Sequence, residues 1–256
     1  MKELIKNSEK LVKKVGLIGG VSHESTAQYY ININQGVMRA LGGLSPIEIM
    51  LISLNCDQMS RYAHEDDWDR VTSVFIEAAK KLERMGADFI VIPCNSLHIV
   101  ADSVAKAIQI PVLNIIDCVG DVIYQEAYSK VALLGTKFTM GQSFYRRRLT
   151  EKFNVQVEVP DQVTQQRIHE IIFTELCQGK FLESSKKIIR SVCEDFYKNG
   201  CQAVILGCTE LPLILRQSET YVPLLLSTDI HSNSIVKFSI QTSIQIQIPI
   251  PIRYAS

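Results

Sequence analysis

Two cysteines stand where apolar segments of strand length come to an end. Cys94 lies in IVIPCNSLHI (90–99) and Cys208 lies in VILGCTELPL (204–213). Both are followed by polar residues that have the pattern of a helix start. A thiol, whose ordinary pKa is about 8.5, becomes a competent base where a helix N-terminus stabilises its thiolate. These cysteines are therefore candidates for acid/base catalysis.

A pair of thiols can carry out a reaction that one thiol cannot. One thiolate removes a proton from a carbon atom and a thiol on the opposite face returns a proton, so that a stereocentre is inverted. A lone cysteine at a strand end is more often a small buried hydrophobic residue. Two cysteines in the same context favour a functional pair. The other cysteines lack that context and are assigned to packing or to the surface: Cys56, Cys118, Cys177, Cys193 and Cys201.

The segments around the two cysteines belong to an internal repeat. VGLIGG (15–20) recurs as VALLGT (131–136), and GADFIVIPCNSLH (86–98) recurs as GCQAVILGCTELP (200–212). IPVLNIID (110–117) recurs as VPLLLSTD (222–229). Three matches in the same order at almost constant spacing indicate two similar lobes, since two copies are too few for a solenoid. Ligands of open α/β sheets bind outside the carboxyl ends of the strands, so the two cysteines are expected to share one cleft.

The elements that would position the cysteines alternate along the chain. Continuous apolar segments at 15–20, 47–55, 87–93 and 110–117 are typical of buried parallel strands. Residues 69–86 have helical periodicity and end at a glycine, as helices often do. We therefore predict the α/β class, with two similar pseudo-symmetric lobes. Each lobe is a mainly parallel sheet flanked by helices, and the active site lies in the interlobe cleft.

The repeat also predicts the domain boundaries. Residues 14–117 together with 229–240 form the first lobe, residues 118–228 form the second, and 1–13 and 241–256 are terminal extensions. The C-terminal segment SIQTSIQIQIPIPIRYAS (239–256) alternates isoleucine with other residues, which suits an edge strand or a packed arm. Its two prolines oppose a central strand.

The composition excludes several kinds of partner. The 256 residues include 27 basic and 27 acidic ones, and this balance gives no electrostatic footprint for nucleic acid. No apolar stretch reaches the roughly 18–20 residues that span a bilayer, so no membrane partner is expected. The start, MKELIKNSEKLVKK, lacks the apolar core of a signal peptide, which predicts a cytoplasmic protein.

The sequence also predicts chemistry without a cofactor. The seven cysteines are an odd number without metal-ligand spacing, so we expect reduced thiols and no metal site. GLIGGVS (16–22) has neither the Walker nor the dinucleotide spacing. No lysine stands in a recognisable pyridoxal-phosphate setting.

Five ordered segments resemble the aspartate/glutamate racemase family, and most closely its aspartate racemases and broad-specificity amino-acid racemases. They are GLIGGVSHESTAQYYININ (16–34), PCNSLH (93–98), ALLGTKFTM (132–140), IIFTELCQG (171–179) and GCTELPLIL (207–215). The resemblance covers roughly residues 14–238. It implies a pyridoxal-phosphate-independent isomerase that interconverts L- and D-aspartate or related acidic amino acids, within a homodimer.

The resemblance also implies roles for individual residues. Cys94 and Cys208 would be the two acid/base residues. Arg167 would bind the side-chain carboxylate, for which the planar guanidinium is well suited. Glu210 would meet the ammonium group or begin a helix. Ser22 would contact the substrate. The remaining polar groups would hold the amino acid's α-carboxylate and ammonium: Asn95, Ser96, Thr136 and Thr209.

Two further residues are weaker candidates, and simpler interpretations stand beside all of these. Arg61 would be a second basic residue for the distal carboxylate, and His98 would orient the Cys94 loop or make a local hydrogen bond. Without the resemblance, Arg61 and Arg167 would be solvated surface charges. Ser22, Asn95 and Thr209 would be helix N-caps, and Thr136 a turn residue.

The chain departs from the family pattern in places. VSH (21–23) stands where the family often has Met-Ser-Trp, and some broad-specificity members have threonine in the place of Cys94. Alternatives to aspartate racemisation are a related isomerase on the same scaffold, such as a glutamate or hydantoin racemase or a maleate isomerase. A non-catalytic amino-acid-binding protein is a third hypothesis, although simple binding needs no thiol on each face.

Overall fold

The structure, a computed structural model, describes residues 12–44 and 47–240. Within these ranges the chain forms two compact units. One contains the residues up to Asn114 and those from His231 on, and the other runs from Ile115 to Ile230. The first is called the N unit below and the second the C unit. The predicted C-terminal arm lies outside the described residues. In the part of the chain that the structure describes, no helix has the length and apolar character needed to cross a membrane.

The sheet of the N unit has four parallel strands in the order β2-β1-β3-β4. They are β1 (Val15–Gly19), β2 (Ile49–Ser53), β3 (Phe89–Val91) and β4 (Val112–Leu113). The helices between them are α2 (His23–Leu41), α3 (Cys56–His64), α4 (Trp68–Arg84), the 3-10 helix η1 (Ser96–Val100) and α5 (Ala101–Lys106). Helix α4 ends at Arg84, and Gly86 follows shortly after it with a φ of 93°. Glycine is common in this left-handed conformation after the end of a helix.

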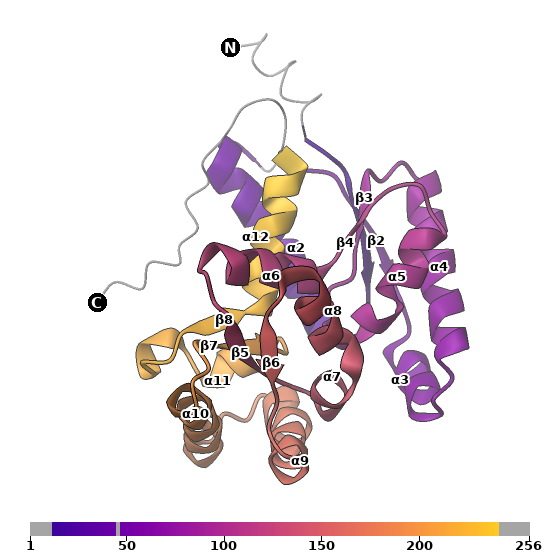
Figure 1. The fold of residues 1–256 in the computed structure, drawn as a ribbon. Coiled ribbons are helices and arrows are strands. Elements are labelled where there is room, and N and C mark those ends of the chain that lie inside the picture. Colours follow the sequence, from indigo (N-terminus) through magenta and orange to yellow (C-terminus); the bar gives the residue numbers. More distant parts are fainter. Residues whose placement is uncertain (1–11, 45–46, 241–256) are drawn as a thin grey trace. The chain divides into compact units, whose positions relative to one another are not determined.

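Side chains of alternate strand residues fill a core on each face of this sheet. Ile18, Ile90 and Ile92 pack with α4 and α5, whereas Val15 and Phe89 pack with α2 and α12 (Ser227–Ile240). Figure 1 shows the resulting layers, with α4 and α5 beside one face of the sheet. Both faces of β1 and β3 are buried, which explains why these two strands are continuously apolar.

The C unit repeats this topology with the strand order β6-β5-β7-β8, again all parallel. Its strands are β5 (Lys130–Gly135), β6 (Gln156–Glu158), β7 (Ala203–Gly207) and β8 (Leu224–Leu226). Its helices are α6 (Ile115–Gln125), α7 (Lys137–Gly141), α8 (Ser143–Phe153), α9 (Gln162–Glu170), the π-helix η2 (Ile171–Glu175), the 3-10 helices η3 (Leu176–Gln178) and η4 (Gln217–Glu219), α10 (Glu183–Lys198) and α11 (Leu211–Ile214).

The two sheets confirm the predicted α/β class and the internal repeat. Each repeated segment forms the same element in both units: β1 matches β5, β3 matches β7, and β4 matches β8. The predicted strands at 47–55 and 87–93 are shorter in the structure, and the one at 110–117 is the most shortened. Residues 110–117 form only the two-residue β4, because α6 begins at Ile115 and buries Ile115 and Ile116 as helical residues. A short apolar run does not distinguish a strand from a buried helix turn.

The last helix of each repeat belongs to the other unit. Helix α6 follows the N-unit strand β4, yet all of it lies in the C unit. Helix α12 follows the C-unit strand β8 and belongs to the N unit from His231 on. Both helices make close contacts in the unit that receives them. A Cβ atom on Gly36 of α2 would lie 2.5 Å from Val236 of α12, and one on Gly120 of α6 would collide with the Phe153 ring of α8.

Candidate active site

Cys94 follows β3 at the carboxyl end of the N-unit sheet. Its side chain is half-buried and packs against the core that includes α4 and α5. Its amide donates to the Ile92 carbonyl at 2.9 Å, and its carbonyl accepts a 2.8 Å hydrogen bond from Nδ1 of the buried His98. The structure therefore brings His98 to the backbone of the Cys94 loop. His98 also lies edge-on to the buried His231, with ring centroids 5.8 Å apart.

Hydrogen bonds connect the turn that contains Ser22 to the segment that precedes Cys94. Ser22 caps α2 by accepting a hydrogen bond from the Ser25 amide at 3.1 Å. The Ser25 hydroxyl donates to the Pro93 carbonyl at 2.7 Å, directly before Cys94. Thr26 adds a bond to the Ser22 carbonyl at 2.8 Å. The capping interpretation of Ser22 is thus correct, and the same bonds hold its hydroxyl near the Cys94 loop.

Ser22 also has an uncommon backbone conformation. Its φ is 108° and its ψ is 129°, outside the regions that non-glycine residues normally occupy. Such conformations concentrate at functional sites, where the surrounding bonds maintain them. Asn95 and Ser96 follow Cys94 at the start of η1. Asn95 is buried and makes no capping hydrogen bond, so its interpretation as an N-cap was wrong.

Cys208 and Thr136 occupy equivalent places at the ends of neighbouring strands in the C unit. Gly135 of β5 pairs with Gly207 of β7, and a Cβ on Gly135 would lie 3.0 Å from the Gly207 carbonyl oxygen. Thr136 and Cys208 are the next residue on each strand, so they emerge side by side. Thr136 accepts from the Thr139 amide at 3.2 Å as the N-cap of α7.

A carboxylate lies directly against Cys208. Its thiol donates to Glu210 Oε2 at 2.8 Å, and the Thr209 hydroxyl donates to the same oxygen at 2.8 Å. Thr209 is not an N-cap, because α11 begins at Leu211 with Glu210 in the capping place and without a side-chain capping bond. The Glu210 side chain therefore turns back to Cys208 and Thr209.

The environment of Cys208 contradicts the expectation that a helix N-terminus stabilises its thiolate. Burial, followed by the negative charge of Glu210, raises the pKa of Cys208 well above its usual value. Helix α11 has only four residues, too few for a large dipole to oppose these two effects. Cys208 is therefore a thiol at neutral pH.

The two predicted arginines lie on helix surfaces. Arg167 is on α9, half-exposed, with Nη1 3.7 Å from Glu170 Oε2. Arg61 is exposed on α3, with its guanidinium 5.9 Å from the centre of the Tyr62 ring. Within the described residues, the structure shows no hydrogen bond or ion pair between either arginine and another predicted site residue.

Two cysteines that were assigned to packing or to the surface are exposed and lie near candidate residues. Cys56 is the first residue of α3, and the Ser22 amide donates a hydrogen bond to its sulfur. Cys177 lies on η3 and acts electrostatically on Cys208. Cys56 also follows a strand end, β2, and Cys177 lies next to a π-helix, which is frequent at functional sites. The strand-end criterion applied to Cys94 would have identified Cys56.

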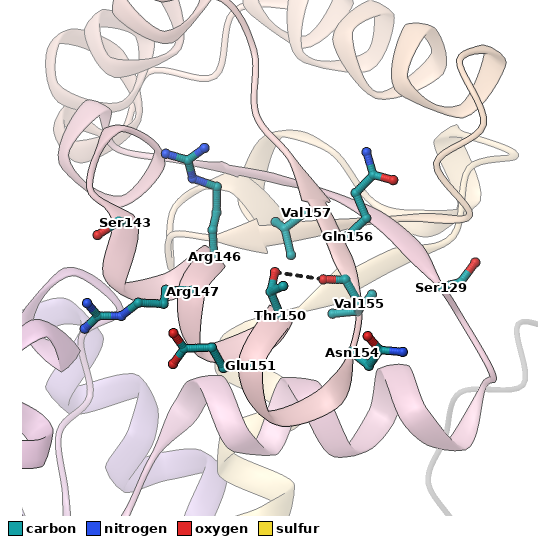
Figure 2. A pocket seen from close by; sticks show the side chains of 10 residues that line it. All are labelled: Ser129, Ser143, Arg146, Arg147, Thr150, Glu151, Asn154, Val155, Gln156 and Val157. Atoms are coloured by element: carbon teal, nitrogen blue, oxygen red, sulfur yellow. Dashed lines mark hydrogen bonds between the residues drawn. The ribbon is translucent and has the colours of Figure 1, made fainter.

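No metal-binding group lies at these residues in the part of the chain that the structure describes. Over residues 12–44 and 47–240, no group of three or more histidine, cysteine or acidic side chains has the arrangement to hold a metal ion. A cavity of about 660 Å³ lies along α8 and β6 in the C unit. Figure 2 shows that Arg146, Arg147 and Gln156 point in different directions around it, and none of the predicted site residues lines it.

Comparison with known proteins agrees with this arrangement of strands. The model of the Asp/Glu/Hydantoin racemase family matches residues 18–235. The chain belongs to this family. Among curated proteins, the broad specificity amino-acid racemase RacX of Bacillus subtilis is 24% identical over 212 residues, which cover 82% of this chain and 91% of RacX.

Solved structures of this family share the fold. A Yersinia pestis protein, assigned provisionally as an Asp/Glu racemase, has 38% identity and a TM-score of 0.86, covering 90% of this chain and 100% of its own. PH1733, an aspartate racemase homologue from Pyrococcus horikoshii, has 33% identity and a TM-score of 0.78 with the same coverage. The predicted family, fold class and enzyme class, an amino-acid racemase, are thereby confirmed.

Proposed function

We propose that this racemase interconverts the L and D forms of aspartate or a related acidic amino acid, without pyridoxal phosphate, with Cys94 and Cys208 as its acid and base. The observation that carries the proposal is the equivalence of the two cysteines. Cys94 follows β3 and Cys208 follows β7. These two strands hold the same place in their sheets, because β3 lies between β1 and β4 and β7 lies between the equivalent strands β5 and β8. A duplicated scaffold that carries a thiol at both equivalent strand ends suits a reaction with two equivalent proton transfers.

The polar groups near each cysteine suit the fixed part of the substrate. In the N unit, the Ser22 hydroxyl and the polar residues Asn95 and Ser96 adjoin the Cys94 loop. In the C unit, Thr136 emerges beside Cys208. We assign these groups to the α-carboxylate and ammonium of an amino acid, which every substrate shares. Arg167 is assigned to the side-chain carboxylate.

The two thiols have unlike tasks in each turnover. One sulfur, as thiolate, takes the proton from Cα, so that an S–H bond forms as the C–H bond breaks. The other gives its proton to the opposite face of Cα, so that a C–H bond forms as its S–H bond breaks. By family analogy we assign the D enantiomer to Cys94 and the L enantiomer to Cys208. We also propose a homodimer, which light scattering of the purified protein would measure.

Racemisation in heavy water tests the chemistry. L-Amino acids, including aspartate, glutamate and neutral ones, are incubated with the protein, and chiral chromatography with mass spectrometry follows both enantiomers. We expect solvent deuterium at Cα of the inverted product, while recovered substrate stays mostly protiated early in the reaction. This asymmetry arises because the donating thiol exchanges with solvent, whereas an abstracted proton can return to the face that it left.

Serine variants assign the two thiols. Cys94→Ser and Cys208→Ser should each lose several orders of magnitude in inversion, about 10³-fold or more, because a hydroxyl is too weak an acid to supply a base near neutral pH. Cys201→Ser is the control, since Cys201 precedes β7 and Cys208 follows the same strand. Near-normal inversion by Cys208→Ser would refute the two-thiol mechanism. If the protein racemises a hydantoin but no amino acid, then its substrates are hydantoins and the proposed amino-acid substrate is wrong.

A further inference from the structure

The oxygen that faces Cys208 accepts two hydrogen bonds. Glu210 Oε2 lies 2.8 Å from the Cys208 sulfur and 2.8 Å from the Thr209 hydroxyl oxygen. Both groups donate to this oxygen, so the thiol keeps its proton in this arrangement. The Thr209 bond holds the carboxylate in place, because a side chain fixed by one neighbour is better oriented toward the next.

The titratable groups that act on Cys208 are few among the described residues. Glu210 acts through charge and through the hydrogen bond, and Cys177 on η3 acts through charge alone. Burial and both of these influences raise the pKa of Cys208, and they outweigh a hydrogen bond from the Glu210 backbone amide, which lowers it. A thiolate formed there would lie in hydrogen-bond range of a like charge with little water to screen it.

We propose that Glu210 is a positioning residue that keeps Cys208 as the proton donor of the resting enzyme, so that the two catalytic sulfurs begin each cycle in different protonation states. This inference rests on the proposed function, since it assigns the starting state of the same pair. It differs from the expectation that Glu210 meets the substrate ammonium. Glu210 would act through the thiol and would not need to touch the substrate.

This role of Glu210 also explains how the resting protonation states are restored after each turnover. When Cys208 donates its proton to Cα, the thiolate left behind faces the Glu210 carboxylate. Repulsion between the two charges favours transfer of a proton from water to the sulfur. The newly protonated Cys94 returns its proton to solvent, so no net proton is gained or lost. The resting form is thereby ready again for the enantiomer whose Cα proton faces Cys94.

Thiol titration of the full-length chain tests the inference without relying on activity. The ultraviolet absorbance of thiolate is measured against pH for the protein and for Cys208→Ser, and the difference reports Cys208. The same pair of measurements is made on a Glu210→Gln background. Glutamine keeps the size of the side chain and removes its charge. We expect the Cys208 midpoint to fall by about one pH unit or more, as loss of an adjacent negative charge should do.

Glu158→Gln is the matched control. Glu158 lies in the same unit on β6. Its charge raises the pKa of Cys201 but does not shift the pKa of Cys208. It should leave the Cys208 midpoint unchanged. Circular dichroism of each variant checks that the fold is retained.

The pH dependence of racemisation supplies a second readout. Loss of kcat/KM at high pH reports ionisation of the acid in the free enzyme, so this limb should move to lower pH in Glu210→Gln. A purely structural glutamate would lower the rate at every pH and leave the limb in place.

The outcomes separate the two proposals. An unchanged or higher Cys208 midpoint in Glu210→Gln, with racemisation intact in the unaltered chain, overturns the role of Glu210 alone. Absence of racemisation of any amino acid overturns the proposed function, while the titration still measures the thiol–carboxylate pair.

Discussion

At the scale of single residues, Ser22 combines a strained backbone with two useful bonds. Its hydroxyl caps α2 and also donates to Glu24 Oε2 at 3.0 Å. A positive φ of this kind costs about 1–3 kcal/mol in a non-glycine residue. Glycine would remove that strain but would lose both hydrogen bonds of the hydroxyl. It would also lose the substrate contact that we propose for Ser22.

We expect Ser22→Gly to be more stable than Ser22→Ala by about 1 kcal/mol or more. Alanine loses the cap, at about 1 kcal/mol, and keeps the strained φ, whereas glycine loses only a few tenths at a cap and adopts the φ freely. Urea unfolding measures both variants. An alanine variant as stable as the glycine variant would show that the backbone here is not strained.

Arg167 should determine the preference for an acidic side chain. We expect Arg167→Ala to raise KM for aspartate by about 10-fold or more and to change KM for a neutral amino acid little, because a charged hydrogen bond contributes about 1.5–3 kcal/mol. Arg190→Ala is the control, since Arg190 is equally exposed, at 49% for both side chains, and pairs with Glu194 along its own helix. Equal effects on both substrates would remove Arg167 from the side-chain pocket.

Residue types and spacing identified Cys94 and Cys208 but not the protonation state of Cys208. The strand ends and the repeat were visible in the sequence because both follow from apolar patterning. The Cys208–Glu210 bond depends on the rotamers of two side chains, which patterning does not encode. The sequence accordingly assigns Glu210 to the substrate ammonium or to a helix start, and it predicts stabilisation of the Cys208 thiolate by a helix dipole, whereas burial raises the pKa of this thiol.

At the scale of elements, α6 is held in the C unit by a cluster of charges. Asp117 on α6 lies 2.5 Å from Arg148 Nε and 2.7 Å from Lys152 Nζ, both on α8. Burial alone would raise the pKa of Asp117, but the hydrogen bonds from Arg148 and Lys152 outweigh it and the net shift is downward. The cluster therefore stabilises the folded chain only while Asp117 is ionised.

We expect Asp117→Asn to lower the free energy of unfolding by about 2 kcal/mol near neutral pH, since it leaves Arg148 without its charged partner. The folded pKa is lowered, so this contribution is complete above the ordinary carboxyl pKa of about 4 and is lost as pH falls below it. Urea unfolding from pH 7 to pH 3 should show the two proteins converging at low pH. Glu48→Gln, in a well-exposed pair with Lys14, should change little at any pH.

The strands and long helices were predictable, whereas the passage from β4 to α6 was not. IPVLNIID is apolar throughout, and nothing in its pattern marks the change from strand to helix at Asn114 and Ile115. Its counterpart VPLLLSTD changes to polar residues at Ser227, where α12 begins. Only the C-unit copy therefore carries a visible boundary.

At the scale of the whole molecule, the repeat in sequence and the compact units do not coincide. Each repeat ends with a helix, α6 or α12, and most or all of that helix belongs to the other unit. The sequence revealed the repeat because equivalent strands resemble each other. The boundaries predicted from the sequence also cross the repeat, because they place residues 229–240 with the first lobe and residues 118–228 in the second.

Fragments of the C unit should distinguish these two divisions. We expect residues 115–230, which include α6, to unfold cooperatively in urea. Residues 127–240, cut at the repeat instead, lack α6 and leave the ring of Phe153 and the Asp117 partners on α8 uncovered. They should show no cooperative transition. Cooperative unfolding of the second fragment alone would mean that α6 is dispensable for this core.

The exchange of helices bears on how such a chain could have arisen. A single ancestral repeat, running from β1 through a helix equivalent to α6, would have buried its last helix in a second copy of itself. It would have been stable only as an intertwined pair of identical chains. Gene duplication and fusion of that pair would then join the copies without changing any packing. Two identical thiols would become Cys94 and Cys208, and the residues after them would be free to diverge: Glu210 stands two positions after Cys208, whereas Ser96 stands two positions after Cys94.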